Sequence, residues 1–361
     1  MNIKWQYKTI GDVCTVERGG SPRPIDKYIT EDENGINWIK IGDTSDSMYI
    51  TETAQKIIPE GMKKSRYVQP GDFLLSNSMS FGRPYILKID GCIHDGWLVL
   101  RDNDGTFDKR FLYYYLSSKS TYQKFKSMAV GGVVNNLNSE MVRKVSVPVP
   151  SISEQQVVAD TLDKLQSIIA HRKQQLAKLD ELIKARFVEM FGDVISNSKK
   201  WNCYIWNDIL TIKNGRNQKQ VENPNGKYLI CGSGGVMGHA DEYITSENSV
   251  IIGRKGNINK PILMKEKFWN VDTAFGLEPN VAIIDVNYLF NFCIFFDFEK
   301  LNKAVTIPSL TKTDLLKIEM PVPPLDLQTQ FADFVKQADK SKFIAEIIIT
   351  TIRRVRLYDQ F

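Results

Sequence analysis

Pro148-Val149-Pro150, followed by Gln155, recurs further along the chain as Pro321-Val322-Pro323, followed by Gln328. The two stretches are 173 residues apart, and each leads from a segment rich in β-branched residues into one with helical periodicity. This stretch decides the fold, because it marks the end of one domain twice and the beginning of a long helix twice.

Two further matches lie towards the N-terminus, in the same order. Pro84 and Asp95 match Pro261 and Asp272 at an offset of 177, and residues 12–16 (DVCTV) are echoed by residues 208–212 (DILTI) at an offset of 196. Since the offset only shrinks, the sequence predicts a duplicated module whose second copy has lost 23 residues, the difference between 196 and 173. This period is too long for a solenoid repeat, so we expect two domains with pseudo-two-fold symmetry.

Each copy is expected to be a β-rich globular domain with a long helix after it. The chain has 361 residues, of which 42% are hydrophobic and 25% charged, enough for two domains with separate cores. Short apolar runs predict strands at residues 72–75, 97–100, 249–252 and 261–264, and helical stretches are expected at 109–125 and 286–303. The predicted fold class is α+β, with β-rich domains at residues 1–150 and 192–323 and long helices at residues 151–191 and 324–361.

Both long helices carry apolar residues at heptad spacing. Ser151 or Ser153 is expected to cap the first helix, Gly192 to end it, and Asp326 to cap the second. A stripe of this kind also occurs in ordinary core helices, but here it is long, occurs twice and each time follows a complete domain. We therefore expect the helices to pack on each other as an antiparallel coiled coil. Its expected seam consists of Leu162, Leu165, Ile169, Leu176, Leu179 and Ile183 in the first helix, and Phe334, Ala338, Ala345, Ile348 and Ile352 in the second.

Composition indicates an intracellular protein. The net charge of +5 is compatible with a polyanionic partner, although a small lysine excess is also common on solvated surfaces. The five cysteines are isolated in sequence, which fits reduced thiols better than a disulfide framework. The N-terminus has no apolar signal region and no apolar run is long enough to span a bilayer, so we expect a cytoplasmic protein without a membrane partner.

The sequence contains no recognisable catalytic motif. It has no Asp/Glu-x-Lys triplet of the common metal-dependent nucleases, no phosphate-binding P-loop and no Asn/Asp-Pro-Pro-aromatic loop of adenine methyltransferases. Three scattered histidines and no clustered cysteines leave no zinc site, and no other metal or cofactor site is expected. The sequence therefore predicts a binding protein, not an enzyme.

Polar, glycine-containing loops at corresponding places in both copies are suited to nucleic acid. Arg and Lys can pair with guanine, Asn and Gln with adenine, and glycine allows close approach to phosphate. For any single residue, an ordinary surface loop is about as good an interpretation, so the prediction depends on the set. The candidate DNA-binding residues are Arg18, Arg23, Lys27, Tyr28, Asn77, Arg83, Asn135 and Asn136 in the first copy, and Arg216, Asn217, Lys219, Arg254, Lys255 and Asn257 in the second.

Taken together, these features resemble the specificity (S) subunits of type I restriction–modification systems, over essentially the whole chain. The order of the motifs and the duplication carry the resemblance more than any single motif does. The motifs are Trp5 with residues 10–13 (IGDV), Arg18-Gly19, residues 38–43 (WIKIGD) and 70–74 (PGDFL), residues 147–150 (VPVP) with Glu154-Gln155, and residues 187–193 (FVEMFGD).

The resemblance implies that each globular copy is a target recognition domain for one half of a bipartite sequence in double-stranded DNA. The helices would then be spacers that fix the distance between half-sites and dock two modification (methyltransferase) subunits, to which restriction subunits are added. S-adenosylmethionine, ATP and magnesium would be used by those partners, so no cofactor is expected in this chain. Two alternatives from other classes stay open: a stand-alone nuclease acting on bipartite DNA, and a scaffold whose domains bind other proteins.

Overall fold

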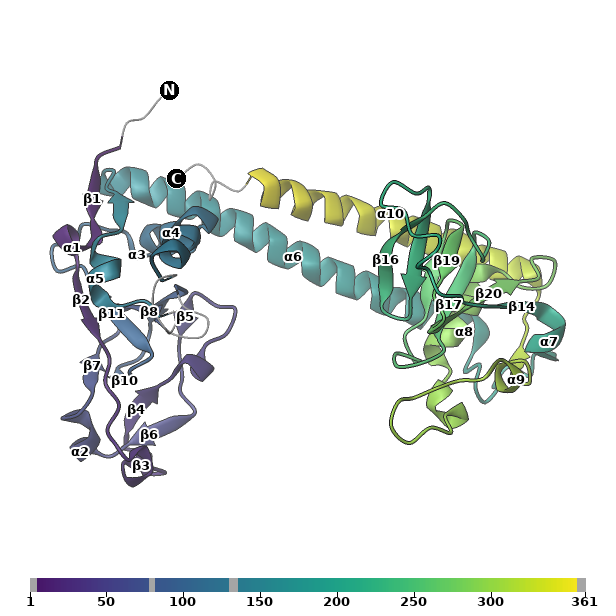
Figure 1. Cartoon of the computed structure of the whole chain (residues 1–361), viewed down its shortest axis with the longest axis horizontal. Coiled ribbons are helices and arrows are strands. Elements are labelled where there is room, and N and C mark those ends of the chain that lie inside the picture. The colour runs from purple at the N-terminus through teal and green to yellow at the C-terminus, as the bar shows by residue number, and fades with distance from the viewer. Residues whose placement is uncertain (1–4, 78–81, 130–135, 356–361) are drawn as a thin grey trace. The chain divides into compact units, whose positions relative to one another are not determined.

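The computed structural model describes residues 5–77, 82–129 and 136–355. The chain divides into two compact units (Figure 1): unit 1 is Met1–Ala170 with Ile349–Phe361, and unit 2 is His171–Ile348. Both boundaries fall within the long helices, α6 (Ile152–Phe191) and α10 (Leu325–Val355), so each helix contributes to both units. We call residues 5–150 the first head and residues 201–323 the second head.

The described part of the first head contains two five-stranded sheets and a two-stranded ribbon. One sheet has the order β2 (Thr15–Arg18), β11 (Trp97–Arg101), β8 (Phe73–Ser76), β9 (Pro84–Leu87), β5 (Tyr49–Ile50). The other has the order β3 (Ile29–Thr30), β6 (Gln55–Ile57), β4 (Ile36–Ile39), β10 (Gly91–Ile93), β7 (Arg66–Val68). The ribbon pairs β1 (Tyr7–Thr9) with β12 (Ser146–Pro148). The helices are α1 (Ile10–Val13), η1 (Ile25–Lys27), η2 (Ile41–Asp43), α2 (Pro59–Met62), α3 (Lys109–Leu116), α4 (Lys119–Ala129) and α5 (Ser139–Arg143).

The second head repeats this plan with smaller sheets. Its larger sheet has the order β14 (Leu210–Asn214), β20 (Ala274–Pro279), β17 (Ser249–Gly253), β18 (Ile262–Met264). Its smaller sheet has the order β16 (Gly235–Ala240), β15 (Tyr228–Gly232), β19 (Phe268–Asn270), and its ribbon pairs β13 (Cys203–Ile205) with β21 (Glu319–Pro321). The helices are α7 (Trp206–Ile209), α8 (Val286–Phe295), η3 (Phe298–Leu301) and α9 (Lys312–Leu315).

Strands stand where the four apolar runs predict them, but the two expected helical stretches are each interrupted. The first stretch breaks after Ser117, because Ser118 Oγ accepts the backbone N–H of Thr121 at 3.2 Å at the start of α4. The second stretch breaks at Asp297, whose side chain accepts the N–H of Glu299 at 3.1 Å and so starts η3. Side-chain acceptors that begin a new helix are the common cause.

The two heads share backbone hydrogen bonds at the offsets found in the sequence. The N–H of Ile10 donates to the Val145 carbonyl at 2.8 Å, and the N–H of Trp206 donates to that of Ile318 at 2.9 Å. The N–H of Leu137 donates to the Asn77 carbonyl and that of Leu310 to the Arg254 carbonyl, both at 2.9 Å. The duplication is therefore a repetition of the backbone architecture as well as of the sequence.

A buried glutamine joins each head to the helix that follows it. Gln155, which is fully buried, donates from Nε2 to the carbonyls of Pro150 (3.0 Å) and Thr106 (2.9 Å), and its Oε1 accepts the N–H of Asp108 at 2.8 Å. The amide thus uses both donors and its acceptor to tie the first turn of α6 to the loop before α3.

The second copy contains the same joint. Gln328, also fully buried, donates to the carbonyls of Pro323 (2.8 Å) and Ile283 (3.1 Å), and its Oε1 accepts the N–H of Asp285 at 2.8 Å. We call these two sets of bonds the glutamine joints. They give a structural reason for the repeated Pro-Val-Pro…Gln pattern.

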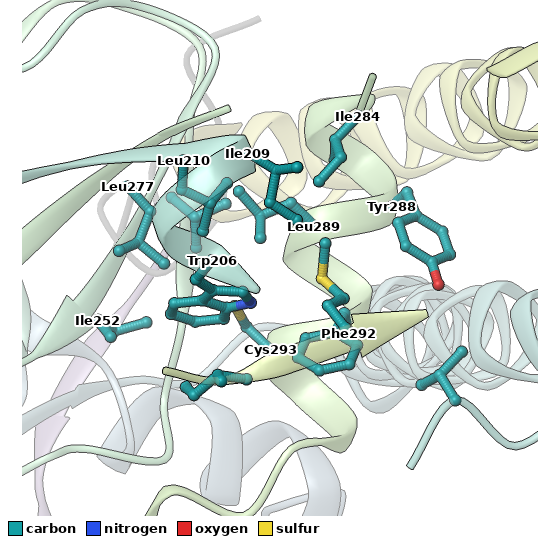
Figure 2. Close-up of a cluster of buried hydrophobic side chains, with 14 of the residues drawn as sticks. Trp206, Ile209, Leu210, Ile252, Leu277, Ile284, Tyr288, Leu289, Phe292 and Cys293 are labelled. Carbon is teal, nitrogen blue, oxygen red and sulfur yellow. The ribbon is translucent and has the colours of Figure 1, made fainter. Parts of the chain in front are cut away.

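The core of unit 2 is aromatic and includes both long helices. Trp206 lies among Leu210, Ile252, Leu277 and Phe292 at its centre (Figure 2). From the helices, Phe187 and Phe191 of α6 lie with ring centroids 5.4 and 5.5 Å from that of Phe331 of α10, and all three are buried. Burial of one such ring stabilises the fold by about 1.5–3 kcal/mol.

Within unit 2, α6 and α10 run in opposite directions along their contact. Asp180 of α6 pairs with Lys342 of α10, and further along α6 the Arg186 guanidinium lies 5.9 Å from the Phe334 ring centroid. The residue number in α10 falls as the residue number in α6 rises, so the two helices are antiparallel along this contact.

The ends of the long helices agree only in part with the expectation. Ser151 and Glu154 cap α6, and Gly192 follows it with a φ of +76°. The helix α10 begins one residue before Asp326, which is therefore not its cap.

The expected seam residues differ in burial. Buried are Leu162, Ile169, Ile183, Ala338 and Ala345, and half-buried are Leu165, Leu176, Leu179, Phe334, Ile348 and Ile352. The heptad pattern did not include Phe187, Phe191, Phe331, Val335 and Ile349, which are buried as well. Four of these five belong to the core of the second head, because near that head each helix packs against the domain and not only against the other helix.

Candidate nucleic-acid interface

In the first head, two segments of the chain converge on Asp95. The main-chain carbonyl of Asp95 accepts hydrogen bonds from Arg18 Nε at 3.0 Å and from Asn77 Nδ2 at 2.9 Å. Its carboxylate accepts Ser21 Oγ at 2.9 Å and Arg23 Nη2 at 3.4 Å. A single residue after β10 therefore fixes residues from the loop that follows β2 and the turn that follows β8.

The surroundings of the Asp95 carboxyl group favour its ionised form. Burial raises the pKa of Asp95, but the Ser21 hydrogen bond and the electrostatic effects of His94, Arg18 and Arg23 outweigh burial, so the pKa lies below its ordinary value. Burial also lowers the pKa of His94, whose Nδ1 accepts the N–H of Gly96 at 2.8 Å. The His94–Asp95 pair thus serves to shape the loop.

Two other candidates lie around the same turn. Arg83 is exposed, and its backbone is held because its N–H donates to Ser76 Oγ at 3.0 Å and its carbonyl accepts the N–H of Ser76 at 3.0 Å. Asn136 is exposed and precedes Leu137, whose N–H donates to the Asn77 carbonyl. Both side chains therefore project from backbone that is fixed next to Asn77.

The second head has an equivalent cluster at Asp272. Arg254 occupies the position of Asn77 at an offset of 177, and its Nη1 donates to the Asp272 carbonyl at 3.4 Å. The N–H groups of Arg254 and Lys255 both donate to the Thr273 carbonyl, at 2.8 and 3.2 Å. The same backbone position therefore carries a cation in the second head and an amide in the first.

The loop after β14 lies beside this turn. The N–H of Arg216 donates to the Asn270 carbonyl and its own carbonyl accepts Trp269 Nε1, both at 3.0 Å, while its side chain is exposed. Asn217 Oδ1 accepts the N–H of Lys219 at 2.9 Å, a turn that leaves both side chains exposed. The exposed cations and amides of this head are thus carried on fixed backbone.

One glycine in each head makes the loop arrangement possible. A Cβ on Gly19 would lie 2.3 Å from the His94 carbonyl oxygen, and a Cβ on Gly215 would lie 1.8 Å from the Val271 carbonyl oxygen. These glycines correspond at the offset of 196, and the residues they contact correspond at 177. The close approach of the two loops is therefore duplicated, and it excludes any side chain at either position.

The candidate residues are accordingly not equivalent. Most are exposed: Arg18, Arg23, Lys27, Arg83, Asn136, Arg216, Asn217, Lys219, Lys255 and Asn257. Arg254 is half-buried, and so is Tyr28, whose hydroxyl accepts Lys64 Nζ at 2.7 Å and whose ring lies in a small apolar cluster. Asn77 is 2% exposed, so in this structure its amide supports Asp95 and cannot contact a base directly. Asn135 lies outside the described residues.

From the sequence, Asp95 is expected to be a structural aspartate that caps a turn before the strand at Trp97, but its bonds to Arg18, Ser21 and Asn77 were not predicted. A signal was present, since Asp95 and Asp272 are matched residues of the duplication. In the described ranges, no group of three or more His, Cys, Asp or Glu side chains is arranged to bind a metal ion. Among the helices described, none is both long and apolar enough to cross a membrane.

Comparison with known proteins identifies one family. The family model described as "Type I restriction modification DNA specificity domain" matches residues 2–181 and again residues 198–352. The type I restriction enzyme MjaIX specificity subunit of Methanocaldococcus jannaschii is 23% identical to this chain, in an alignment that covers 98% of this chain and 90% of that protein. The EcoKI specificity subunit of Escherichia coli is 22% identical over 66% of this chain and 55% of its own length.

Solved structures show the same fold. The S subunit of a type I restriction–modification system from M. genitalium superposes with a TM-score of 0.58 and 17% identity, covering 98% of this chain and 94% of that one. A chain from a structural study of complex assembly and conformational transition of the type I R-M system gives a TM-score of 0.64 at 15% identity, covering 99% and 97%.

Proposed function

Because the chain belongs to the family of type I restriction–modification specificity subunits, we propose that it reads a bipartite DNA sequence, one half-site with each head. Members of this family are non-catalytic DNA-recognition subunits, and this chain has two target recognition domains of that kind. On this proposal, residues 1–150 and 192–323 are the recognition domains. Residues 151–191 and 324–361 form the spacer.

One observation carries the proposal: the same loop cluster occurs twice with different side chains. Where the first head has the buried Asn77, which supports the loop, the second head has the half-buried Arg254, and the exposed Arg23 and Lys219 match at the offset of 196. A common scaffold with different hydrogen-bonding groups suits two different half-sites, since base edges in the major groove are distinguished by donor and acceptor pattern. The exposed arginines and lysines of both clusters would also neutralise phosphates.

The helices are proposed to act as a spacer in the form of an antiparallel coiled coil. The 40 residues of α6 correspond to about 60 Å of helix at 1.5 Å per residue. Successive major-groove faces of DNA recur about every 34 Å, so a helix of this length is long enough to separate two reading heads by one or more turns. The antiparallel contacts of Asp180 and Arg186 with α10 support this arrangement.

The proposed partners follow from the family, whose members bind DNA and assemble with methyltransferase and restriction subunits. We propose that two modification subunits dock on the paired helices, that restriction subunits join this complex, and that the assembly acts in the cytoplasm. Exposed apolar side chains on α10, Phe343 (62%), Ile344 (57%) and Ile347 (47%), support a protein contact along this helix.

The experiment that tests the proposal compares one arginine from each head. The chain is expressed with its modification subunits in a host that lacks them, and the methylated sequence is mapped across the genome. Arg83→Ala is expected to relax or weaken one half-site, and Arg254→Ala the other, by about tenfold for each lost base contact. If both substitutions alter the same half-site, or if no sequence is methylated, the proposal is wrong.

A further inference from the structure

An exposed apolar loop lies beside the loop cluster of the second head that contains Arg254, Lys255 and Asp272. Residues 302–311 connect η3 to α9 (Figure 1), and within them Val305 is fully exposed (102%) and Ile307 is 58% exposed. Single exposed hydrophobic residues are ordinary on protein surfaces. Two β-branched residues at the tip of one loop, next to candidate base-reading residues, are a more specific arrangement.

The base of this loop is closed by an asparagine. Asn302 Oδ1 accepts the N–H groups of Ala304 at 3.0 Å and Ser309 at 3.1 Å, and so links both ends of the loop. Lys303 Nζ contacts Asp314 at 2.9 Å on the neighbouring helix α9. The tip is therefore presented from a closed base, which lowers the entropy lost when it contacts a partner.

The same loop is joined to the turn that carries Arg254 and Lys255. The N–H of Gly256 donates to the Pro308 carbonyl at 2.9 Å, the N–H of Leu310 donates to the Arg254 carbonyl at 2.9 Å, and Lys255 pairs with Ser309 in a β-bridge. Any DNA read by Arg254 and Lys255 would thus have the apolar tip within reach. The exposed Lys255 supplies positive charge at this position, which suits a polyanion better than an apolar protein surface.

We infer that Val305, with Ile307, forms an apolar contact to the 5-methyl group of a thymine in the half-site read by the second head. This inference rests on the proposed function and makes it more specific. Thymine is the base whose major-groove edge presents a methyl group, and apolar side chains recognise it there. The loop would add an apolar contact to the hydrogen bonds made by Arg254, Lys255 and their neighbours.

The test replaces thymine by uracil, which removes the methyl group and leaves base pairing unchanged. The full chain with its modification subunits is titrated with its cognate duplex, and each thymine of the second half-site is replaced in turn. We expect one position at which uracil weakens binding about threefold to fivefold, as for one buried methyl group. With Val305→Ala, the thymine and uracil duplexes at that position should bind equally.

Val281→Ala is the matched control. Val281 is also exposed (75%) and lies in the second head, but it follows the opposite end of the β14–β20 pair, where Leu210 faces Pro279. This variant should keep the full preference for thymine. Ile307→Ala should reduce the preference partly, because this side chain is less exposed.

Three outcomes would overturn the inference and leave the proposed function intact: cognate binding without any uracil-sensitive position, a second half-site without an A·T pair, or an unchanged thymine preference in Val305→Ala. Impaired assembly with the modification subunits, together with an unchanged thymine preference, would assign the loop to a protein contact. If the wild-type chain, assembled with its modification subunits, shows no sequence-specific DNA binding, the proposed function is refuted, and the inference with it.

Discussion

The two heads have the same backbone joints but differ in the side chains of the loop clusters around Asp95 and Asp272. In the first head, Asp95 collects Arg18, Ser21, Arg23 and Asn77 into one network. In the second head, Asp272 is exposed and its carbonyl accepts Arg254. The comparison teaches that backbone hydrogen bonds preserve the scaffold, while the polar groups it presents can change almost completely.

The heads also differ in the number of strands of one sheet, which contains β10 in the first head and β19 in the second. The first head has five strands there, and the described second head has three, with β10 and β19 at equivalent positions and offset 177. In place of the strands β3 and β7, the second head has single bridges only, which pair Glu222 with Ala240 of β16 and Thr245 with Phe268 of β19. The shortening falls between Gly19, matched by Gly215 at offset 196, and Val68, matched by Thr245 at offset 177. The losses therefore fall away from the glutamine joints.

The largest expected effect comes from the aromatic contact between α6 and α10 in unit 2, which Phe187, Phe191 and Phe331 make. Phe331→Ala should destabilise unit 2 by about 3–5 kcal/mol, because it removes a buried ring between Phe187 and Phe191. The equivalent position in the first copy, at offset 173, is the half-buried Val158, and Val158→Ala should cost no more than about 1–2 kcal/mol. Hydrogen exchange measured for each unit checks this, and equal losses would contradict the distinction.

The glutamine joints should behave alike in both copies. Gln155→Leu leaves the buried carbonyl of Pro150, the carbonyl of Thr106 and the N–H of Asp108 without their present partner, which should cost about 2–4 kcal/mol. Gln328→Leu should cost the same within about 1 kcal/mol, since its three bonds correspond one by one. Urea denaturation monitored separately in each head gives both values. A large effect in only one of the two would show that the joints are not equivalent.

The smallest expected effect concerns the two matched aspartates. The pKa of Asp95 is lowered in the fold, so its contribution to stability is present above the unfolded pKa of about 3.9 and is lost as the pH falls through the folded value. Asp95→Asn should therefore reduce stability by about 0.5–1 kcal/mol at pH 7, and the difference should shrink below about pH 4.

Asp272→Asn is the matched comparison, because the second head has an exposed aspartate at the equivalent position. This substitution should leave stability unchanged within error at both pH values. Urea denaturation of both variants at pH 7 and pH 3.5 provides the measurement. A similar loss in both variants would mean that the Asp95 network contributes nothing specific to the first head.

Much of the architecture could be predicted from the sequence because it is written twice. The offsets of 196, 177 and 173 located the two copies, and the heptad spacing located the long helices that α6 and α10 form. Helix caps were predictable only where a local motif exists: Ser151, one of the two expected caps, caps α6 together with Glu154, whereas α10 begins before Asp326. In that case Pro324, whose carbonyl accepts the N–H of Leu327, precedes the helix instead.

The burial of individual polar residues could not be predicted from local sequence. Asn77 has the composition and loop context of a base-reading residue, yet Asp95, 18 positions away, takes its amide. The seam of the helices shows the same limit: Phe331 and Val335 are buried because the second head covers that face, and the heptad pattern selects Phe334 instead. Whether such a residue is buried depends on residues far away in the sequence, and a local sequence pattern does not identify them.

The glutamine joints have a consequence for how such a gene can change over generations. Both joints lie next to a Pro-Val-Pro motif, and each connects its domain to its helix through backbone atoms and one amide. Because the glutamine bonds only to backbone atoms of the head, a crossover at the motif would allow an incoming domain of the same fold to be joined to the helix in the same way. New pairs of binding preferences could thus arise in a single genetic exchange, without an intermediate that folds poorly.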